Sequence, residues 1–370
     1  MVLPDEWRWH DPDRQNAEPP GDAESADPSP GDPAGPALGA PVTADAEPAA
    51  VRMDRHLAPS EMRDALADDV RAGLTSSPKT LPPKWFYDAR GSELFSAITD
   101  LPEYYLTRRE RAILEAHATD IAQQSMADTL IELGSGTSEK TRLLLRALQA
   151  TGTLRRYVPF DVDATVLTTA SAEVAEELPG ITVHAVVGDF ERHLPLLPAG
   201  GRRLVAVLGS TIGNLSPVQR ASFLHVLRQG LAPGDSLLLG TDLVKEPARL
   251  VAAYDDAAGV TAEFNRNVLR VLARELAADV DPDAFEHVAV WDADNEWVEM
   301  RLRSRVDQTV RVLGLQVPFA AGEELRTETS AKFRERGITD ELTAAGLHLR
   351  SWWVDPDGDY ALSLSTRAGH

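Results

Sequence analysis

The glycine-containing segment 129–141 holds the first residues whose types and spacing suggest ligand chemistry. A β-branched and aliphatic run leads into Gly134 and Gly136, and a helical pattern follows. Backbone N–H groups at such a turn can bind a nucleotide-like ligand. A dinucleotide fingerprint needs a third glycine where this chain has Glu139, and Glu132 precedes the turn, as an acidic residue commonly does in methyltransferases. The segment favours a methyltransferase turn over a dinucleotide turn, and a glycine turn without a ligand is the remaining alternative.

Two further acidic residues follow predicted strands. Asp161 lies 27 positions after Gly134, close to where an acidic side chain accepts the ribose hydroxyls of an adenosyl ligand. Asp189 can accept a hydrogen bond from an adenine amino group, and the ring of Phe190 can face the base. Each aspartate could instead cap the helix that follows it. Together with Glu132 they make three acidic strand ends in register, which favours an adenosyl-ligand site.

Asn214 and Lys140 are further polar residues near these strand ends. Asn214 comes before a Ser216-Pro217 helix start, at the position where amino-group methyltransferases contact the methyl acceptor. Lys140 comes directly after the glycine turn, and its alternative interpretation is a solvent-facing helix lysine. Asn214 is therefore the candidate for contact with an acceptor amine.

Three tyrosines, Tyr87, Tyr104 and Tyr105, lie in loops upstream of the glycine turn. A phenol can donate a hydrogen bond to a substrate carboxylate without forming a salt bridge. The alternative for each tyrosine is ordinary core packing with its hydroxyl group reaching water.

Strands alternate with helical patterns from residue 129 onward, which indicates a doubly wound parallel sheet. Ligands bind such a sheet at the carboxyl ends of its strands, where the polar residues above lie. Upstream, Ser60 is the expected cap of one helix, and Thr107-x-x-Glu110 has the form of a capping box for another. The expected strands are one that ends at Gly134, then 157–161, 182–187, 204–209 and 236–241.

Beyond residue 245 the pattern changes to that of an inserted α+β unit. Helices are expected over 248–254 and 260–276, and antiparallel strands over 288–291, 297–303 and 309–317. A last pair of strands, 347–354 and 360–365, resembles the antiparallel pair with which methyltransferase sheets commonly end. We therefore predict an α/β fold of the class I, Rossmann-like methyltransferase type, with an inserted substrate-binding domain.

The predicted organisation has five parts in chain order. They are a disordered, acidic, Pro-rich tail (1–52), the N-terminal part of the substrate-binding domain (53–108), the methyltransferase core (109–244), the inserted substrate-binding domain (245–333) and the C-terminal completion of the core sheet (334–370). The tail is expected because it shows no apolar periodicity and cannot offset its ordering entropy by burial. An alternative is that translation begins at Met53.

Composition excludes several classes of function. The 370 residues carry a formal net charge of -21, which argues against nucleic-acid backbones and anionic lipids as partners. No apolar run approaches the roughly 20 residues of a membrane-spanning helix. The chain has no cysteine, and none of its nine histidines forms an H-x-H or H-x-x-x-H pair, so no metal site is visible. We expect a soluble, cytoplasmic protein without a metal centre.

Eight motifs together resemble one known family. They are DARGS at 88–92, LPEYY at 101–105, ELGSGTSEKT at 132–141, PFDVD at 159–163, LGSTIGNL at 208–215, GTDLVK at 240–245, FNRNVL at 264–269 and TETSAKF at 327–333. They closely resemble the bacterial L-histidine Nα-methyltransferase family of ergothioneine biosynthesis. The resemblance runs from about Arg55 to the C-terminus, and Leu106 departs from it where a proline is expected.

The resemblance implies a monomeric enzyme that methylates the α-amino group of L-histidine three times, giving Nα,Nα,Nα-trimethylhistidine (hercynine). The methyl donor is S-adenosylmethionine (SAM). The implied SAM contacts are Gly134, Lys140, Asp161, Asp189 and Phe190. The implied substrate contacts are Tyr104 and Tyr254 for the carboxylate, Asn214 and Tyr87 for the reacting α-amino end, and Glu328 with Ser330 for the imidazole ring.

Glu328 and Ser330 alternate along an extended segment, so their side chains are expected on one face. Without the resemblance, Glu328 would be interpreted as a surface strand glutamate. One alternative function is a methyltransferase of the same fold for another small amine or amino acid. Another is a non-catalytic SAM-binding module. A nicotinamide oxidoreductase is disfavoured by Glu139.

Overall fold

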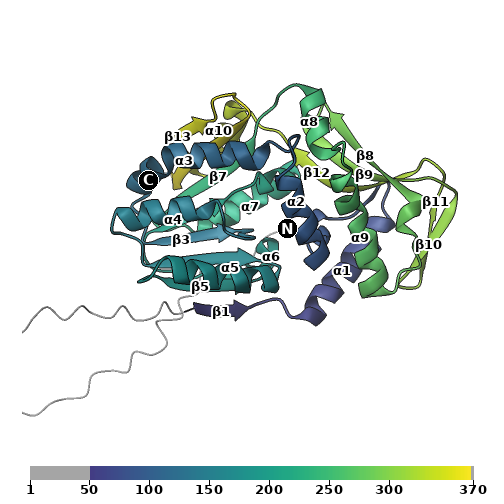
Figure 1. The fold of residues 1–370 in the computed structure, drawn as a ribbon, viewed down its shortest axis with the longest axis horizontal. Coiled ribbons are helices and arrows are strands. Elements are labelled where there is room, and N and C mark those ends of the chain that lie inside the picture. The colour runs from purple at the N-terminus through teal and green to yellow at the C-terminus, as the bar shows by residue number, and fades with distance from the viewer. Residues whose placement is uncertain (1–50, 368–370) are drawn as a thin grey trace, which may run out of the picture.

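The computed structural model describes residues 51–367, which form one large and one smaller sheet surrounded by helices (Figure 1). The large sheet has the strand order β1-β5-β4-β3-β6-β7-β14-β13. Its first six strands in that order are parallel, and β14 and β13 are antiparallel. This confirms the predicted fold class. The bounds are β1 Val51–Arg55, β3 Thr129–Leu133, β4 Arg156–Asp161, β5 Thr182–Val187, β6 Arg203–Val207, β7 Ser236–Asp242, β13 Leu347–Val354 and β14 Tyr360–Arg367.

Helices cover both faces of the large sheet because its strands are apolar on both sides. Leu130 of β3 packs with α3 and α4 on one face, whereas Ile131 and Leu133 pack with α7 and α10 on the other. The bounds are α3 Leu106–Ser125, α4 Thr141–Ala150, α5 Ala164–Glu177, α6 Phe190–His193, α7 Pro217–Gly230 and α10 Glu335–Ala344, with 3₁₀ turns η3 Leu194–Leu196 and η4 Thr211–Asn214.

The smaller sheet lies beside the large one and has the order β2-β12-β9-β8, with a separate hairpin β10-β11 (Figure 1). The predicted strand 309–317 is in fact this hairpin, because Leu313 and Gly314 both have positive φ and turn the chain. The strand bounds are β2 Lys79–Thr80, β8 Phe285–Asp292, β9 Trp297–Ser304, β10 Gln308–Val312, β11 Leu315–Phe319 and β12 Glu324–Ala331. The helices here are α1 Pro59–Leu74, α2 Ala89–Thr99, α8 Pro247–Tyr254 and α9 Val260–Leu276, with 3₁₀ turns η2 Pro83–Phe86 and η5 Pro282–Ala284.

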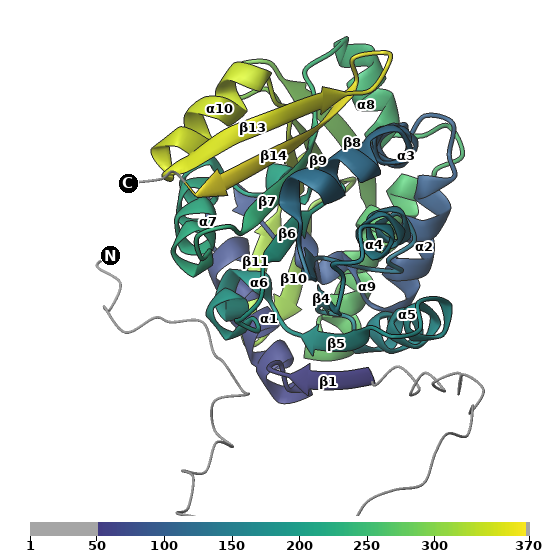
Figure 2. The ribbon, with the colours of Figure 1, turned by 90° about the vertical axis from the view of Figure 1, so that its left-hand side faces the viewer.

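The predicted boundary between the tail and the folded chain, at Met53, is wrong, because strand β1 begins at Val51. It forms one edge of the large sheet and pairs in parallel with β5, from Val51 opposite Val183 to Arg55 opposite Val187 (Figure 2). Asp54 holds it there through His184 Nε2 at 2.8 Å. Residues 1–50 of the predicted tail lie outside the described residues. The predicted division into domains otherwise stays a proposal.

Two predicted helix starts also differ from the structure. Helix α1 begins at Pro59, after Ala58, rather than after a Ser60 cap. Helix α3 begins at Leu106 without a side-chain cap, so the expected capping box does not form. Glu110 is instead wholly buried, where its carboxylate pairs with Lys140. In residues 51–367 no helix is both long and apolar enough to cross a membrane.

Candidate active site

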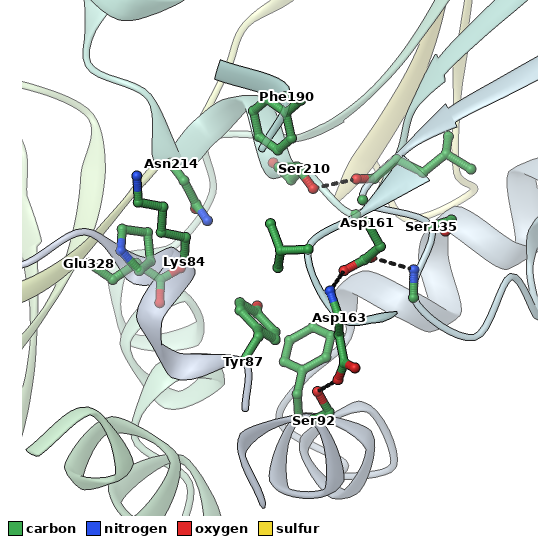
Figure 3. A pocket seen from close by; sticks show the side chains of 18 of the residues that line it. Lys84, Tyr87, Ser92, Ser135, Asp161, Asp163, Phe190, Ser210, Asn214 and Glu328 are labelled. Carbon is green, nitrogen blue, oxygen red and sulfur yellow. Dashed lines mark hydrogen bonds between the residues drawn. The ribbon is translucent and has the colours of Figure 1, made fainter. Parts of the chain in front are cut away.

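A cavity of about 1000 Å³ lies between the carboxyl ends of the large-sheet strands and strand β12 of the smaller sheet (Figure 3). Segments far apart in the sequence meet there because parallel strands end at the same edge of a sheet. All eleven predicted site residues line it: Tyr87, Tyr104, Gly134, Lys140, Asp161, Asp189, Phe190, Asn214, Tyr254, Glu328 and Ser330. Their individual roles stay predictions.

The glycine turn after β3 is hydrogen-bonded to the end of β4. Gly134 and Gly136 have φ values of 73° and 48°, which favour glycine. The Gly136 N–H donates to Asp161 Oδ2 at 2.9 Å, and the Asp163 N–H donates to Asp161 Oδ1 at 3.1 Å. Burial raises the pKa of Asp161, although these backbone bonds favour its charged form. The carboxylate is therefore fixed in place before any ligand binds.

Glu132 lies beneath the turn rather than in contact with solvent. Its carboxylate accepts hydrogen bonds from the hydroxyl groups of Thr141 and Tyr157, the second at 2.6 Å. Burial raises the pKa of Glu132 to about 7. This acidic residue joins β3, β4 and the first turn of α4, which sets the shape of the glycine turn.

Asp189 and Phe190 lie at the end of β5, as predicted. Lys84 Nζ lies 3.2 Å from Asp189 Oδ2 and 3.2 Å from Asp69 Oδ2. An adenine amino group at Asp189 would therefore share the carboxylate with an ammonium group. The Phe190 ring packs edge-on against Phe223, with ring centroids 5.7 Å apart.

Lys140 has a structural partner that the sequence did not reveal. Its ammonium pairs with Glu110, whose other oxygen accepts hydrogen bonds from the Gly209 N–H and the Tyr360 hydroxyl group, both at 2.8 Å. The surface alternative for Lys140 is therefore wrong. Its predicted contact with SAM stays a prediction.

The opposite wall of the cavity is aromatic. The rings of Tyr87 and Phe95 have centroids 5.5 Å apart, and those of Tyr104 and Tyr254 are 6.4 Å apart. Burial raises the pKa of Tyr87, Tyr104 and Tyr254 well above the usual phenol value. These phenols stay protonated at neutral pH and can donate hydrogen bonds to an anion.

Asn214 and Glu328 lie next to each other on one side of the cavity (Figure 3). The Asn214 amide is satisfied when its nitrogen donates to Glu328 Oε1 and to the Thr329 carbonyl oxygen, both at 3.2 Å. Its amide oxygen is then the group that can accept an amine N–H. Burial raises the pKa of Glu328 to about 7, with Lys332 acting in the opposite direction.

Ser330 extends the same wall next to Tyr254. Their hydroxyl oxygens lie 2.7 Å apart. A β-bulge in β12, between Arg326 and Glu328, places Glu328 and Ser330 on the cavity side while Thr327 is buried. The expectation that Glu328 and Ser330 share a face is confirmed.

These features place a glycine turn of the type found in SAM-binding proteins and a set of buried polar side chains around one cavity. The model of the family described as histidine-specific, SAM-dependent methyltransferases matches residues 66–367. The chain belongs to this family of histidine-specific methyltransferases.

Curated relatives agree with the family match. The chain is 61% identical over 314 residues to a histidine N-alpha-methyltransferase of Mycolicibacterium smegmatis, covering 84% of this chain and 98% of the relative. It is 57% identical to the protein of the same name from Mycobacterium tuberculosis, covering 86% and 99% of the two chains. Ergothioneine biosynthesis protein 1 of Neurospora crassa is 37% identical over 83% of this chain and 36% of its own length.

In this histidine-specific methyltransferase, sequence reasoning missed some polar residues around the cavity. Lys84 and Ser92 reach the large sheet from the N-terminal segment, and Ser92 Oγ donates to Asp163 at 3.2 Å (Figure 3). Lys332 and Asp242 form an ion pair behind Ser330. Only Lys332 had a signal in the sequence, since it continues the alternation of Glu328 and Ser330.

A cluster of acidic side chains lies outside the cavity of this methyltransferase. Asp355, Asp357 and Asp359 have carboxylate oxygens within 4.8 Å of one another. Arg109 contacts all three, and Arg249 contacts Asp359 at 2.7 Å. Two guanidinium groups therefore pair with this cluster of three carboxylates, and the predicted absence of a metal centre stays a prediction.

Proposed function

We propose that this protein transfers methyl groups from SAM to the α-amino nitrogen of L-histidine, three times in succession, as the first step of ergothioneine biosynthesis. The observation that carries the proposal is the single cavity that the glycine turn shares with Asn214 and Glu328. The family and the names of the mycobacterial and Neurospora relatives support it.

The residues on the large-sheet side fit an adenosyl ligand. Asp161 presents a fixed carboxylate for ribose hydroxyls, and Phe190 offers a ring to the base. Ser135 Oγ is buried at the cavity without a hydrogen-bond partner among the described residues, as expected of a group that awaits a ligand. SAM supplies an electrophilic methyl group on a sulfonium when it is bound.

The residues on the opposite side hold and orient the amine. Methyl transfer needs a neutral amine whose lone pair points at the methyl carbon, so positioning and exclusion of water contribute most of the rate. The Asn214 oxygen can accept an amine N–H and turn the lone pair away from itself. Each of the first two transfers releases a proton from nitrogen, and the third gives a quaternary ammonium group.

Anchoring the rest of the substrate keeps the nitrogen in place as it loses N–H donors. We assign the carboxylate to the phenols of Tyr104 and Tyr254, and the ring to Glu328 and Ser330. A ligand without a ring N–H would leave the half-buried carboxylate of Glu328 without that partner, so the site would disfavour it. This argues against the alternative of another amino acid as substrate.

Mass spectrometry tests the proposal. The purified protein is incubated with SAM and each common amino acid separately, and we expect only histidine to gain three methyl groups. Methylation of a different amino acid would overturn the ring pocket. SAM binding without methylation of any amino acid would favour the non-catalytic module.

A further inference from the structure

Lys332 is wholly buried behind the cavity and takes no part in the function proposed above. Its ammonium group lies 2.9 Å from Asp242 Oδ2, 2.8 Å from the Tyr254 hydroxyl group and 2.9 Å from Ser330 Oγ. These three oxygen acceptors match the three N–H donors of an ammonium group. Tyr254 and Ser330 line the cavity, so Lys332 lies one hydroxyl group away from a bound ligand.

The ammonium groups of Lys332 and Lys245 both lie beside the carboxylate of Asp242, and Asp359 and Glu328 are further carboxylates near them. Lys245 Nζ lies 2.5 Å from Asp242 Oδ1, so two ammonium groups share one buried carboxylate. The Tyr105 hydroxyl group also contacts this carboxylate, but it is neutral. No ion pair joins Glu328 to Lys332 in residues 51–367. Because a buried charge is costly without a counter-ion, this arrangement favours an anion on the cavity side of Tyr254 and Ser330.

The two hydroxyl groups can pass this charge to a ligand. Their oxygens lie 2.7 Å apart and either hydroxyl group can be the donor; when Ser330 donates to Tyr254, the Tyr254 proton is free to point into the cavity. Lys332 donates to both oxygens, and a hydroxyl group that accepts from a cation becomes a stronger donor itself.

We propose that Lys332 is a positioning residue that supplies the positive charge for the substrate carboxylate, acting through Tyr254. This inference rests on the proposed function, in which Tyr254 contacts that carboxylate. An ammonium group has no lone pair, and this one also lies behind a hydroxyl group, so it does not compete with the reacting amine for the methyl group.

The test compares two ligands that differ only at the carboxylate. L-histidinol keeps the ring and the α-amine of L-histidine but carries a hydroxymethyl group instead of the carboxylate. Calorimetry with bound S-adenosylhomocysteine, which cannot donate a methyl group, gives both dissociation constants. For Lys332→Met we expect the constant for histidine to rise about 10- to 100-fold, and that for histidinol to change less than about threefold.

Lys245→Met is the matched control. It removes the other ammonium group from Asp242, but the remaining contacts of Lys245 are with Tyr105 and the Leu243 carbonyl group, and neither residue lines the cavity. We expect it to lower the melting temperature as Lys332→Met does, while the preference for histidine over histidinol stays within about threefold of the wild-type value. An equal loss of preference in both variants would overturn the proposal.

Tyr254→Phe keeps the ion pair between Lys332 and Asp242. It therefore provides a second test of the proposal if Lys332→Met does not fold. It is expected to lose the same preference for the carboxylate, and an unchanged preference would overturn the role of Lys332. The methylation assay on the wild-type protein separates the two proposals. If histidine is methylated but Lys332→Met weakens both ligands equally, only the inference about Lys332 fails.

Discussion

At the scale of single residues, the site depends on two carboxyl groups whose pKa values are raised by burial. Burial raises the pKa values of Glu132 and Glu328 to about 7. Both residues line the cavity, but Glu132 already accepts hydrogen bonds from two hydroxyl groups, whereas the protein partner of Glu328 is the Asn214 amide. Glu132 is therefore a structural group, and Glu328 is the one that a ligand can complete.

Glu328→Gln should raise the melting temperature at pH 8 more than at pH 5. The pKa of Glu328 is raised from 4.5 to about 7, so the folded protein binds more protons than the unfolded chain between these values. The stability that the Glu328 carboxyl group contributes therefore falls as pH rises from 4.5 to 7. A glutamine side chain does not titrate, so Glu328→Gln does not lose stability in this range. Thermal unfolding at both pH values checks this, with the exposed Glu335→Gln as control. An equal shift for Glu328→Gln at both pH values would contradict it.

Asn214→Ala is expected to leave SAM binding intact and to lower the methylation rate about 100-fold or more, because the amine loses the group that orients its lone pair. Binding is measured by calorimetry and transfer by mass spectrometry. Weakened SAM binding would place Asn214 on the adenosyl side instead.

The sequence was sufficient to predict the cavity-lining residues that follow strands, because strand ends of a parallel sheet meet regardless of their distance along the chain. It could not predict Asp242 or the partner of Lys140. The sequence does not distinguish a buried charged residue from an exposed one, because the partner of a buried charge is known only once the fold is known. Glu110 and Lys140 are 30 positions apart.

At the scale of elements, α3 holds the loop after β6 against the glycine turn. Glu110 of α3 contacts Lys140 beside α4, the Gly209 N–H after β6 and Tyr360 of β14. One carboxylate thus connects α3 to the start of α4, the loop after β6 and strand β14 beneath the cavity. Removal of its cation partner leaves a buried charge unpaired.

Lys140→Met is therefore expected to destabilise the protein by about 3–5 kcal/mol, as for other broken buried ion pairs. The neighbouring pair of Arg111 and Glu139 is more exposed, and Arg111→Met should cost less than about 1 kcal/mol. Urea unfolding of both variants gives the comparison. Equal losses would mean that Glu110 does not depend on Lys140.

Two features of the elements were not predicted correctly, namely strand β1 and the start of α3, and the reasons differ. β1 has two arginines and an aspartate in five residues and follows a Pro-rich segment, so the alternation of its two apolar residues, Val51 and Met53, is too short to indicate a strand. Its parallel pairing with β5 determines its conformation. For α3, the local capping pattern was overridden by the burial of Glu110, a tertiary effect that spacing does not encode.

At the scale of the whole molecule, both edges of the large sheet carry features that disfavour pairing with a second sheet. β1 is short and charged, and β13 contains a bulge between Leu349 and Ser351 (Figure 2). We therefore predict a monomer, and light scattering should give a mass near 40.2 kDa. A mass of twice that value would contradict the prediction.

The position of β14 has a consequence for how the protein is made. This strand lies inside the large sheet, between β7 and β13, and its Tyr360 contacts Glu110, which is 250 residues earlier in the chain. On the ribosome, β3 to β7 emerge long before the strand that covers β7. The nascent chain therefore carries an open sheet edge while residues 243–359 are synthesised, and the floor of the methyl-transfer site closes only when β14 arrives.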